Sequence, residues 1–193
     1  MTKLTPKDLI TIGIFTILLY ILSLLVAFVG ITPMTSLFAS PLYALLAGPI
    51  FMLYIAKIKK PIAISITGLF CSVLCLLSFT SIVMAGISLA CFLVADFIAS
   101  RKNYTNFVVN TIAYLVFCLW SLAINGGYWY LQDFMVAFSL ASGMEQSWLD
   151  GMVAIATPLN FVLMVLGTLI AAFISTIFAK LMFKKHFKKA GII

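Results

Sequence analysis

The stretch LITIGIFTILLYILSLLVAFVGI, at residues 9–31, decides the fold class of this chain, because it contains no charged residue. A helix needs about 20 apolar residues to cross a bilayer core of roughly 30 Å. The stretch meets that length and exceeds the apolar part of a secretory signal, so we expect a first membrane span and not a cleaved leader. The rest of the chain resembles it, with 64% of all residues hydrophobic and 9% charged. Such a composition indicates a chain whose solvent is lipid.

Apolar runs of similar length continue along the chain and predict six transmembrane helices. They cover residues 9–31, 35–56, 61–79, 82–99, 107–131 and 157–183. Pro41 and Pro49 lie inside the second run and lack a backbone N–H, so we expect this segment to be kinked or to begin as a re-entrant loop. Little sequence remains for a soluble part. Residues 1–193 are therefore expected to form a single all-α integral membrane domain.

The basic residues predict the orientation of the six helices. All twelve Lys and Arg residues fall on the side of the two termini, in four separate segments. The positive-inside rule assigns that side to the cytoplasm, which places both termini there in a bacterial cell membrane. The net charge of +7 is spread too widely for a nucleic-acid site, so no nucleic-acid partner is expected. Anionic lipid headgroups or a cytoplasmic protein fit this charge better.

No group in the chain predicts catalysis. The single histidine, His186, cannot form a metal site or a catalytic triad alone, and no Walker A, HExxH or GxSxG motif is present. We therefore expect no metal, no cofactor and no enzymatic activity. The cysteines lie within expected spans and are interpreted as packing residues. They are Cys71, Cys75, Cys91 and Cys118.

The positions of the carboxylates exclude some classes of membrane protein. None lies at the middle of an expected span, which argues against a carrier driven by protons or sodium ions. Asp96 lies about one turn from the end of the fourth span, close to Arg101 in the sequence. We interpret Asp96 as one half of an interfacial or helix-end ion pair, with a functional role as the alternative.

The side opposite the basic residues holds the most informative cluster of side chains. The only acidic residues expected there are Asp133, Glu145 and Asp150, which share their segment with several aromatic and amide residues. One interpretation is an interfacial belt of aromatic residues. The other is a pocket in which rings stack on a heteroaromatic solute and a few polar groups orient it.

Two features favour the pocket. Asn125 precedes Gly126 and Gly127, a pair that loosens the helix and lets the backbone approach a ligand. Asn160 lies at nearly the same depth in the last span, so the two amides either share a polar site or bond each other. Trp120 lies deeper, where it would floor a pocket or pack in the core. Tyr128 and Trp129 complete this set of candidates.

Three stretches carry a resemblance to a known family. They are PKDLITIGIF at residues 6–15, residues 41–57 with GPIFML at 48–53, and KKHFKKAGI at residues 184–192. Together they resemble the MptS (Trep_Strep) family of bacterial membrane proteins, which are regarded as substrate-binding S components of energy-coupling factor (ECF) vitamin transporters. The resemblance extends over nearly the whole chain and implies a six-helix bundle like that of ECF S components.

The resemblance also implies a mechanism. Such S components bind one vitamin-like solute near the outer side and associate with a transmembrane coupling protein (EcfT type) and two cytoplasmic ATPases (EcfA type). ATP hydrolysis in these partners drives the S component to topple in the membrane and release its solute inside. The family pattern places ligand contacts in regions that add Thr35, Ser81 and Met84 to the candidates.

One departure from the family pattern concerns docking on the coupling protein. Many S components carry an Ala-xxx-Ala motif in the first span, whereas residues 11–16 of this chain read TIGIFT. Gly13 and Thr16 are expected to leave a smooth patch there, although the alanine pair is missing. Docking through the first span is therefore less clearly implied than the family itself.

The candidate residues and the resemblance together predict the solute. Tryptophan, tyrosine and asparagine suit a small neutral or weakly cationic heteroaromatic ring, and the outer acids attract cations. Hydroxymethylpyrimidine or a vitamin B6 form such as pyridoxine matches that chemistry within this transporter class. The alternative is a membrane-embedded enzyme, or a structural or accessory membrane protein with no transport role.

Overall fold

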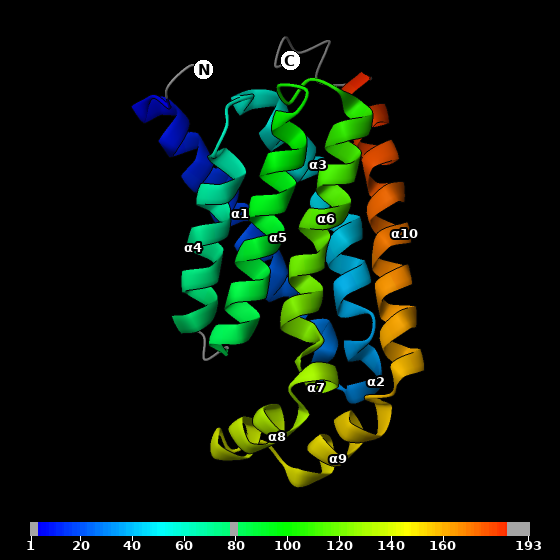
Figure 1. Cartoon of the computed structure of the whole chain (residues 1–193). Coiled ribbons are helices and arrows are strands. Elements are labelled where there is room, and N and C mark those ends of the chain that lie inside the picture. Colours follow the sequence, from blue (N-terminus) through cyan, green and yellow to red (C-terminus); the bar gives the residue numbers. More distant parts are fainter. Residues whose placement is uncertain (1–3, 78–80, 185–193) are drawn as a thin grey trace.

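The computed structural model describes residues 4–77 and 81–184, and it is helical throughout, with no strand in those two ranges. Six of the described helices run up and down through the molecule, as Figure 1 shows. Five of them are long and apolar enough to cross a membrane, and the shorter α4 completes the bundle. The predicted all-α membrane fold is thus confirmed. The six are α1 (Pro6–Ala27), α3 (Ala39–Ile58), α4 (Ala63–Leu77), α5 (Ile82–Ser100), α6 (Phe107–Asn125) and α10 (Pro158–Met182).

Helices α3 and α6 are the central members of the six-helix bundle. Contacts run from α1 to α4, α5, α6, α10, α3 and back to α1, and α3 also touches α6 across the middle. In the spans that contain α3 and α6, 56% of the residues are buried, against 28% for those of α1 and α10. The two termini lie at one end of the bundle, which agrees with an even number of crossings (Figure 1).

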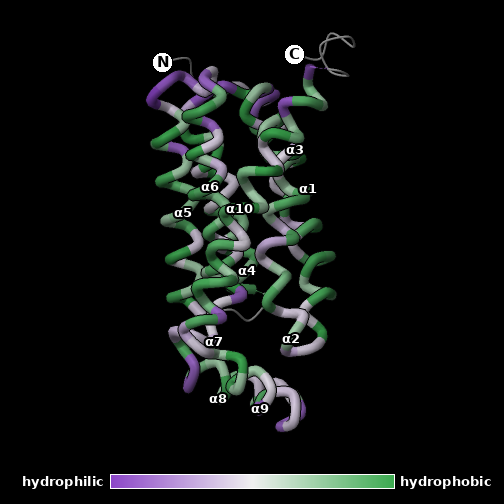
Figure 2. Tube along the Cα trace, turned by 90° about the vertical axis from the view of Figure 1, so that its right-hand side faces the viewer, coloured by the Kyte–Doolittle hydropathy of each residue, from purple (hydrophilic) through white to green (hydrophobic). Residues whose placement is uncertain are grey.

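The outer surface of the bundle is apolar along its length. Figure 2 shows hydrophobic residues over the helices and hydrophilic residues gathered toward the two ends. On α1, large side chains such as Ile10, Ile14 and Ile17 are more than half exposed. A surface of this kind is stable only against lipid tails, because water would make such exposure unfavourable.

Helix α1 begins at a reciprocal cap. The Thr5 hydroxyl accepts from the Asp8 backbone N–H, and the Asp8 carboxylate accepts from the Thr5 backbone N–H at 2.6 Å. The same carboxylate forms an ion pair with Lys60 at 2.5 Å. This pair fastens the start of α1 to the turn between α3 and α4.

The second span departs from its expected form. A short helix, α2 (Pro33–Ser36), precedes α3, and α3 is unbroken from Ala39 to Ile58 across Pro49. Pro41 lies in the first turn of α3, where its missing N–H has no helical partner in any case. Neither proline therefore interrupts α3, and the irregular part of the span is the turn between α2 and α3.

Packing against α10 explains why Pro49 is tolerated. Pro49 frees the carbonyl of Leu45, and the Ser175 hydroxyl on α10 donates to that oxygen at 2.5 Å. Gly48 permits the approach, because a Cβ atom on Gly48 would lie 2.8 Å from the Ser175 Cβ. A small residue on α3 and a hydroxyl on α10 thus replace the lost backbone bond.

The fifth span is shorter than expected, because α6 ends at Asn125 and Gly126 caps it. The chain then turns into three short helices that cover the end of the bundle opposite the termini (Figure 1). The predicted interruption at the glycine pair is therefore a helix end. These helices are α7 (Gly127–Tyr130), α8 (Gln132–Ala141) and α9 (Gln146–Ile155).

Candidate functional site

A cavity of about 220 Å³ lies between α1, α3, α4 and α6. We call it the solute cavity. Its lining includes Ala27 at the end of α1, Ala39 at the start of α3 and Asn125 at the end of α6. It therefore lies in the half of the bundle next to α7–α9 and away from the termini.

Two aromatic side chains on the central helices line this cavity. Tyr43 on α3 and Trp120 on α6 pack edge to face, with ring centroids 5.4 Å apart. Both are almost fully buried. Neither the Tyr43 hydroxyl nor the Trp120 indole N–H has a hydrogen-bond partner within residues 4–77 and 81–184. A buried polar group left unpaired costs about 1–3 kcal/mol, so these two groups are suited to a ligand.

Asn125 adds an amide to the same cavity. Its Nδ2 donates to the Ser40 hydroxyl at 3.0 Å and to the Ser121 carbonyl at 2.9 Å. These bonds hold the side chain in place and leave the oxygen Oδ1 able to accept. Among the described residues, no charged side chain lines the cavity. The cavity therefore combines an uncharged wall with hydrogen-bonding groups.

Of the predicted site residues that the structure describes, Trp120 and Asn125 line the solute cavity. Tyr128 belongs to the cover formed by α7–α9, and Met84 on α5 packs against this cover. The Tyr128 hydroxyl shares a hydrogen bond with Ser139 at 2.6 Å, and its ring packs edge-on against Trp148 at 6.0 Å. Burial raises the pKa of Tyr128. Met84 packs on Gly127, where an added Cβ would lie 2.7 Å from its Cε.

Trp129 and Asn160 meet at the start of α10. The Trp129 indole N–H donates to the Thr157 carbonyl at 2.9 Å, and Asn160 donates from Nδ2 to the Ile155 carbonyl at 2.8 Å. Thr157 also caps α10 by accepting from the Asn160 backbone N–H. Asn125 and Asn160 thus bond to different partners, and the paired amides expected from the sequence are not formed.

The remaining two candidates lie at the starts of helices. Ser81 caps α5 and accepts from the Val83 backbone N–H at 3.2 Å. Thr35 completes the reciprocal cap of α2 with Thr32. Neither lines the solute cavity in the described ranges. Their hydroxyl groups hold the ends of helices in place.

A family model described as "Hypothetical bacterial integral membrane protein (Trep_Strep)" matches residues 6–189. The chain belongs to the Trep_Strep family. No curated protein and no solved structure matches it. Family membership and the apolar helices agree that this Trep_Strep protein is a multi-pass bacterial membrane protein.

Sequence reasoning missed several residues of the solute cavity in this Trep_Strep protein. Tyr43 is the most important, and Tyr20, Ser121 and Cys75 also line it. Cys75 is buried in the core, as expected for a packing residue, and it also lies at the cavity wall. A tyrosine hydroxyl inside an apolar span was the available signal, since such a group needs a partner or a function.

The expected ion pair between Asp96 and Arg101 is not formed, because each residue has other partners. Its carboxylate accepts from the Ser65 backbone N–H at 3.0 Å, from the Ser65 hydroxyl at 2.5 Å and from the Tyr104 hydroxyl at 2.6 Å. Arg101 instead lies over the Phe97 ring at 4.2 Å. The carboxylate of this Trep_Strep protein therefore caps the start of α4 and holds the turn between α5 and α6.

Proposed function

We propose that this Trep_Strep protein is the membrane-embedded substrate-binding (S) component of an ECF-type ABC importer. The observation that supports the proposal best is the solute cavity, which combines an uncharged wall with unpaired hydrogen-bonding groups. A buried apolar cavity of roughly 150 Å³ takes benzene. A cavity of about 220 Å³ therefore suits one substituted aromatic ring.

The cavity chemistry supports a vitamin or vitamin precursor of the heteroaromatic type. The Trp120 N–H and the Tyr43 hydroxyl can donate to ring nitrogens or ring substituents, and the Asn125 oxygen can accept from a hydroxyl or amino group. Hydroxymethylpyrimidine and pyridoxine each carry such groups on a single ring. Asp133, Glu145 and Asp150 belong to the α8–α9 region above the cavity and favour the approach of weak cations.

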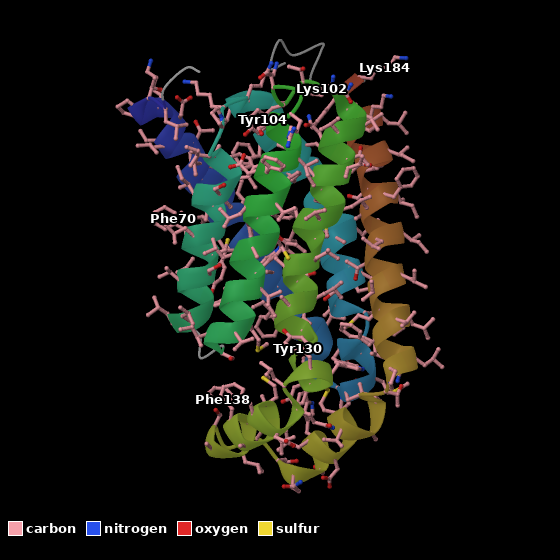
Figure 3. The ribbon with its side chains drawn as sticks, viewed as in Figure 1. Phe70, Lys102, Tyr104, Tyr130, Phe138 and Lys184 are labelled. Carbon is pink, nitrogen blue, oxygen red and sulfur yellow. The ribbon has the colours of Figure 1, made fainter. Side chains whose placement is uncertain are left out.

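The end that carries the termini is proposed to face the cytoplasm. Basic residues that the structure describes lie there, including Lys102 and Lys184 (Figure 3), and the positive-inside rule assigns such an end to the cytoplasm. A transmembrane coupling protein and two ATPases would associate there, and ATP hydrolysis would take place in those partners. The chain itself would carry out no catalysis.

The proposed patch on α1 that would contact the coupling protein consists of Gly13 and Thr16, and the structure favours only the first. A Cβ atom on Gly13 would meet nothing within 4 Å, so the backbone is open to a neighbouring helix at that point. Thr16 does not share this surface. It is buried and donates to the Thr67 hydroxyl at 3.1 Å. The smooth patch expected from both residues is therefore reduced to Gly13.

Native mass spectrometry of the detergent-purified protein tests the proposal. Hydroxymethylpyrimidine and pyridoxine are added separately, with adenine as a larger ring control. We expect a single bound copy of one of the two small rings, and co-purification with the coupling protein and ATPases when all are expressed together. A protein that binds no vitamin of a broad panel and never associates with these partners contradicts the proposal.

A further inference from the structure

A second cavity lies at the end of the bundle that carries the termini. Its volume is about 240 Å³, and it is formed by α3, α6, α10 and the turn between α5 and α6. Tyr104, which Figure 3 labels at this end together with Lys102 and Lys184, contributes to its wall. We call it the basic cavity. It is separate from the solute cavity and shares no lining residue with it.

Two lysines give the basic cavity its charge. Lys59 follows the last residue of α3 and is held there with a φ of 46°. Lys180 lies in the last turn of α10, with its Nζ 4.5 Å from the centre of the Phe107 ring. The ring contact positions the ammonium group and uses none of its N–H donors. Both lysines line the same cavity and can donate to one anion.

No acid in the described residues neutralises this pair of lysines. No carboxylate lines the basic cavity. The two acids at this end have other partners, because Asp8 pairs with Lys60 and Asp96 accepts from Ser65 and Tyr104. The cavity therefore favours a negatively charged group.

Asn110 supplies a second, independent indication of a ligand. It lines the basic cavity, and only 7% of its surface is exposed. Its Nδ2 donates to the Tyr104 carbonyl at 3.0 Å, whereas its oxygen Oδ1 has no donor within the described chain. A buried oxygen without a donor is unfavourable. A ligand that carries a hydroxyl group beside its negative charge would satisfy it.

We propose that the basic cavity binds the headgroup of an anionic glycerophospholipid. The phosphate lies between Lys59 and Lys180, and a headgroup hydroxyl donates to the Asn110 oxygen. The apolar side chains of Met52, Phe107 and Phe183 form part of the wall, which suits the glycerol backbone of a lipid better than a free phosphate ion. Basic cavities between helices at a membrane surface are favourable sites for such headgroups.

Lipid titrations monitored by native mass spectrometry of the full chain test this site. The probes are phosphatidylglycerol, phosphatidylmethanol, which has the same charge and no headgroup hydroxyl, and phosphatidylcholine. We expect phosphatidylglycerol to bind at least three-fold more tightly than phosphatidylmethanol and at least ten-fold more tightly than phosphatidylcholine. Inorganic phosphate is titrated in parallel to detect a site for free anions.

Matched charge variants separate the cavity from general surface attraction. The double variant Lys59→Gln with Lys180→Gln should weaken phosphatidylglycerol binding at least ten-fold. The control is Lys57→Gln with Lys102→Gln, which removes the same charge from exposed lysines outside the cavity wall and should change binding less than two-fold.

Three outcomes overturn the proposal. One is an equal loss of binding in both double variants. Another is equal affinity for phosphatidylglycerol and phosphatidylcholine. The third is binding of inorganic phosphate without selective lipid binding. The preference for phosphatidylglycerol over phosphatidylmethanol is measured on the unmodified chain. The test of the Asn110 contact therefore needs no Asn110 variant, which could fail to fold.

Discussion

Two buried polar clusters lie near opposite ends of the bundle, and they differ in how their hydrogen bonds are satisfied. Around Asp96, three donors from Ser65 and Tyr104 reach the carboxylate. In the solute cavity, the Tyr43 hydroxyl and the Trp120 N–H have no partner among the described residues. A satisfied cluster holds helices together, whereas an unsatisfied one reserves its hydrogen bonds for another molecule. The difference indicates a structural role for the first cluster and supports the binding role proposed for the second.

The Asp96 cluster also stabilises two unusual turns. Ile62 and Tyr104 both have positive φ values, 71° and 60°, which are unfavourable for residues with a Cβ. Ile62 lies in the turn before α4, and Tyr104 in the turn after α5. Because Asp96 accepts from Tyr104 and from Ser65 on α4, one carboxylate holds both turns in place.

The largest expected effect comes from removing this carboxylate. Asp96→Ala leaves the donors of Ser65 and Tyr104 unpaired, and we expect the free energy of unfolding to fall by about 3 kcal/mol or more. Thermal unfolding in detergent measures the loss. Asp133→Ala, at an exposed acid on α8, should change stability by less than about 0.5 kcal/mol. An Asp96 variant as stable as the control would show that the Asp96 cluster does not stabilise the fold.

Alkaline pH tests the same cluster through Tyr104. Burial and the nearby Asp96 carboxylate raise the pKa of Tyr104 well above its usual value of 10.0. The folded state therefore favours the protonated tyrosine. This contribution is complete below pH 10, the usual tyrosine value, and is lost as pH rises through the folded pKa.

The matched variant is Tyr104→Phe. We expect it to be less stable than the unmodified chain at pH 8, because it lacks the hydrogen bond to Asp96. The difference should shrink above pH 10 by up to about 1.4 kcal/mol per pH unit. Unfolding measured at several pH values checks this, and a constant difference from pH 8 to pH 11 would contradict the assignment.

A pair of tyrosines sharpens the comparison at the solute cavity. The Tyr43 hydroxyl is unpaired, whereas the Tyr114 hydroxyl donates to the Ala44 carbonyl at 2.6 Å. Tyr43→Phe should leave stability unchanged or slightly higher and weaken vitamin binding roughly three- to ten-fold. Tyr114→Phe should reduce stability by about 1 kcal/mol and leave affinity unchanged. The reverse pattern would place the ligand elsewhere.

The two amides give the smallest expected effects. Asn125→Ala removes an acceptor from the solute cavity and should weaken binding by a few-fold. Asn160→Ala removes the bond to the Ile155 carbonyl and should reduce stability by about 1 kcal/mol without a change in affinity. Titration with the bound vitamin and thermal unfolding of both variants measure the two effects. An equal loss of affinity in the two variants would support a binding site shared by both amides.

The fold was predictable because lipid imposes strong rules on the sequence. Each span had to be apolar over about 20 residues, and the basic residues had to gather on one side. The predicted positions of the helix ends were less accurate. Gly126 ends α6 early, and the second span begins as α2, because caps and turns depend on single residues and their local hydrogen bonds.

The site was only partly predictable. Trp120 and Asn125 were found because they are polar groups inside an apolar span. Tyr128, Trp129 and Asn160 looked equally suitable. Their hydrogen bonds instead join α7 to α8, α7 to the N-cap of α10, and α10 to the end of α9. A residue list contains no information about which polar groups meet a partner from another helix.

The sequence by itself determined the membrane environment, the six helices and the side that collects the basic residues, since these follow from composition and order along the chain. Only the tertiary structure decided which polar groups are free to bind. Tyr43 and Tyr114 are both tyrosines inside apolar helices, and one has a carbonyl within reach while the other has none among the described residues. Hydrogen-bond satisfaction is a property of helix packing, and packing brings together residues far apart in the chain.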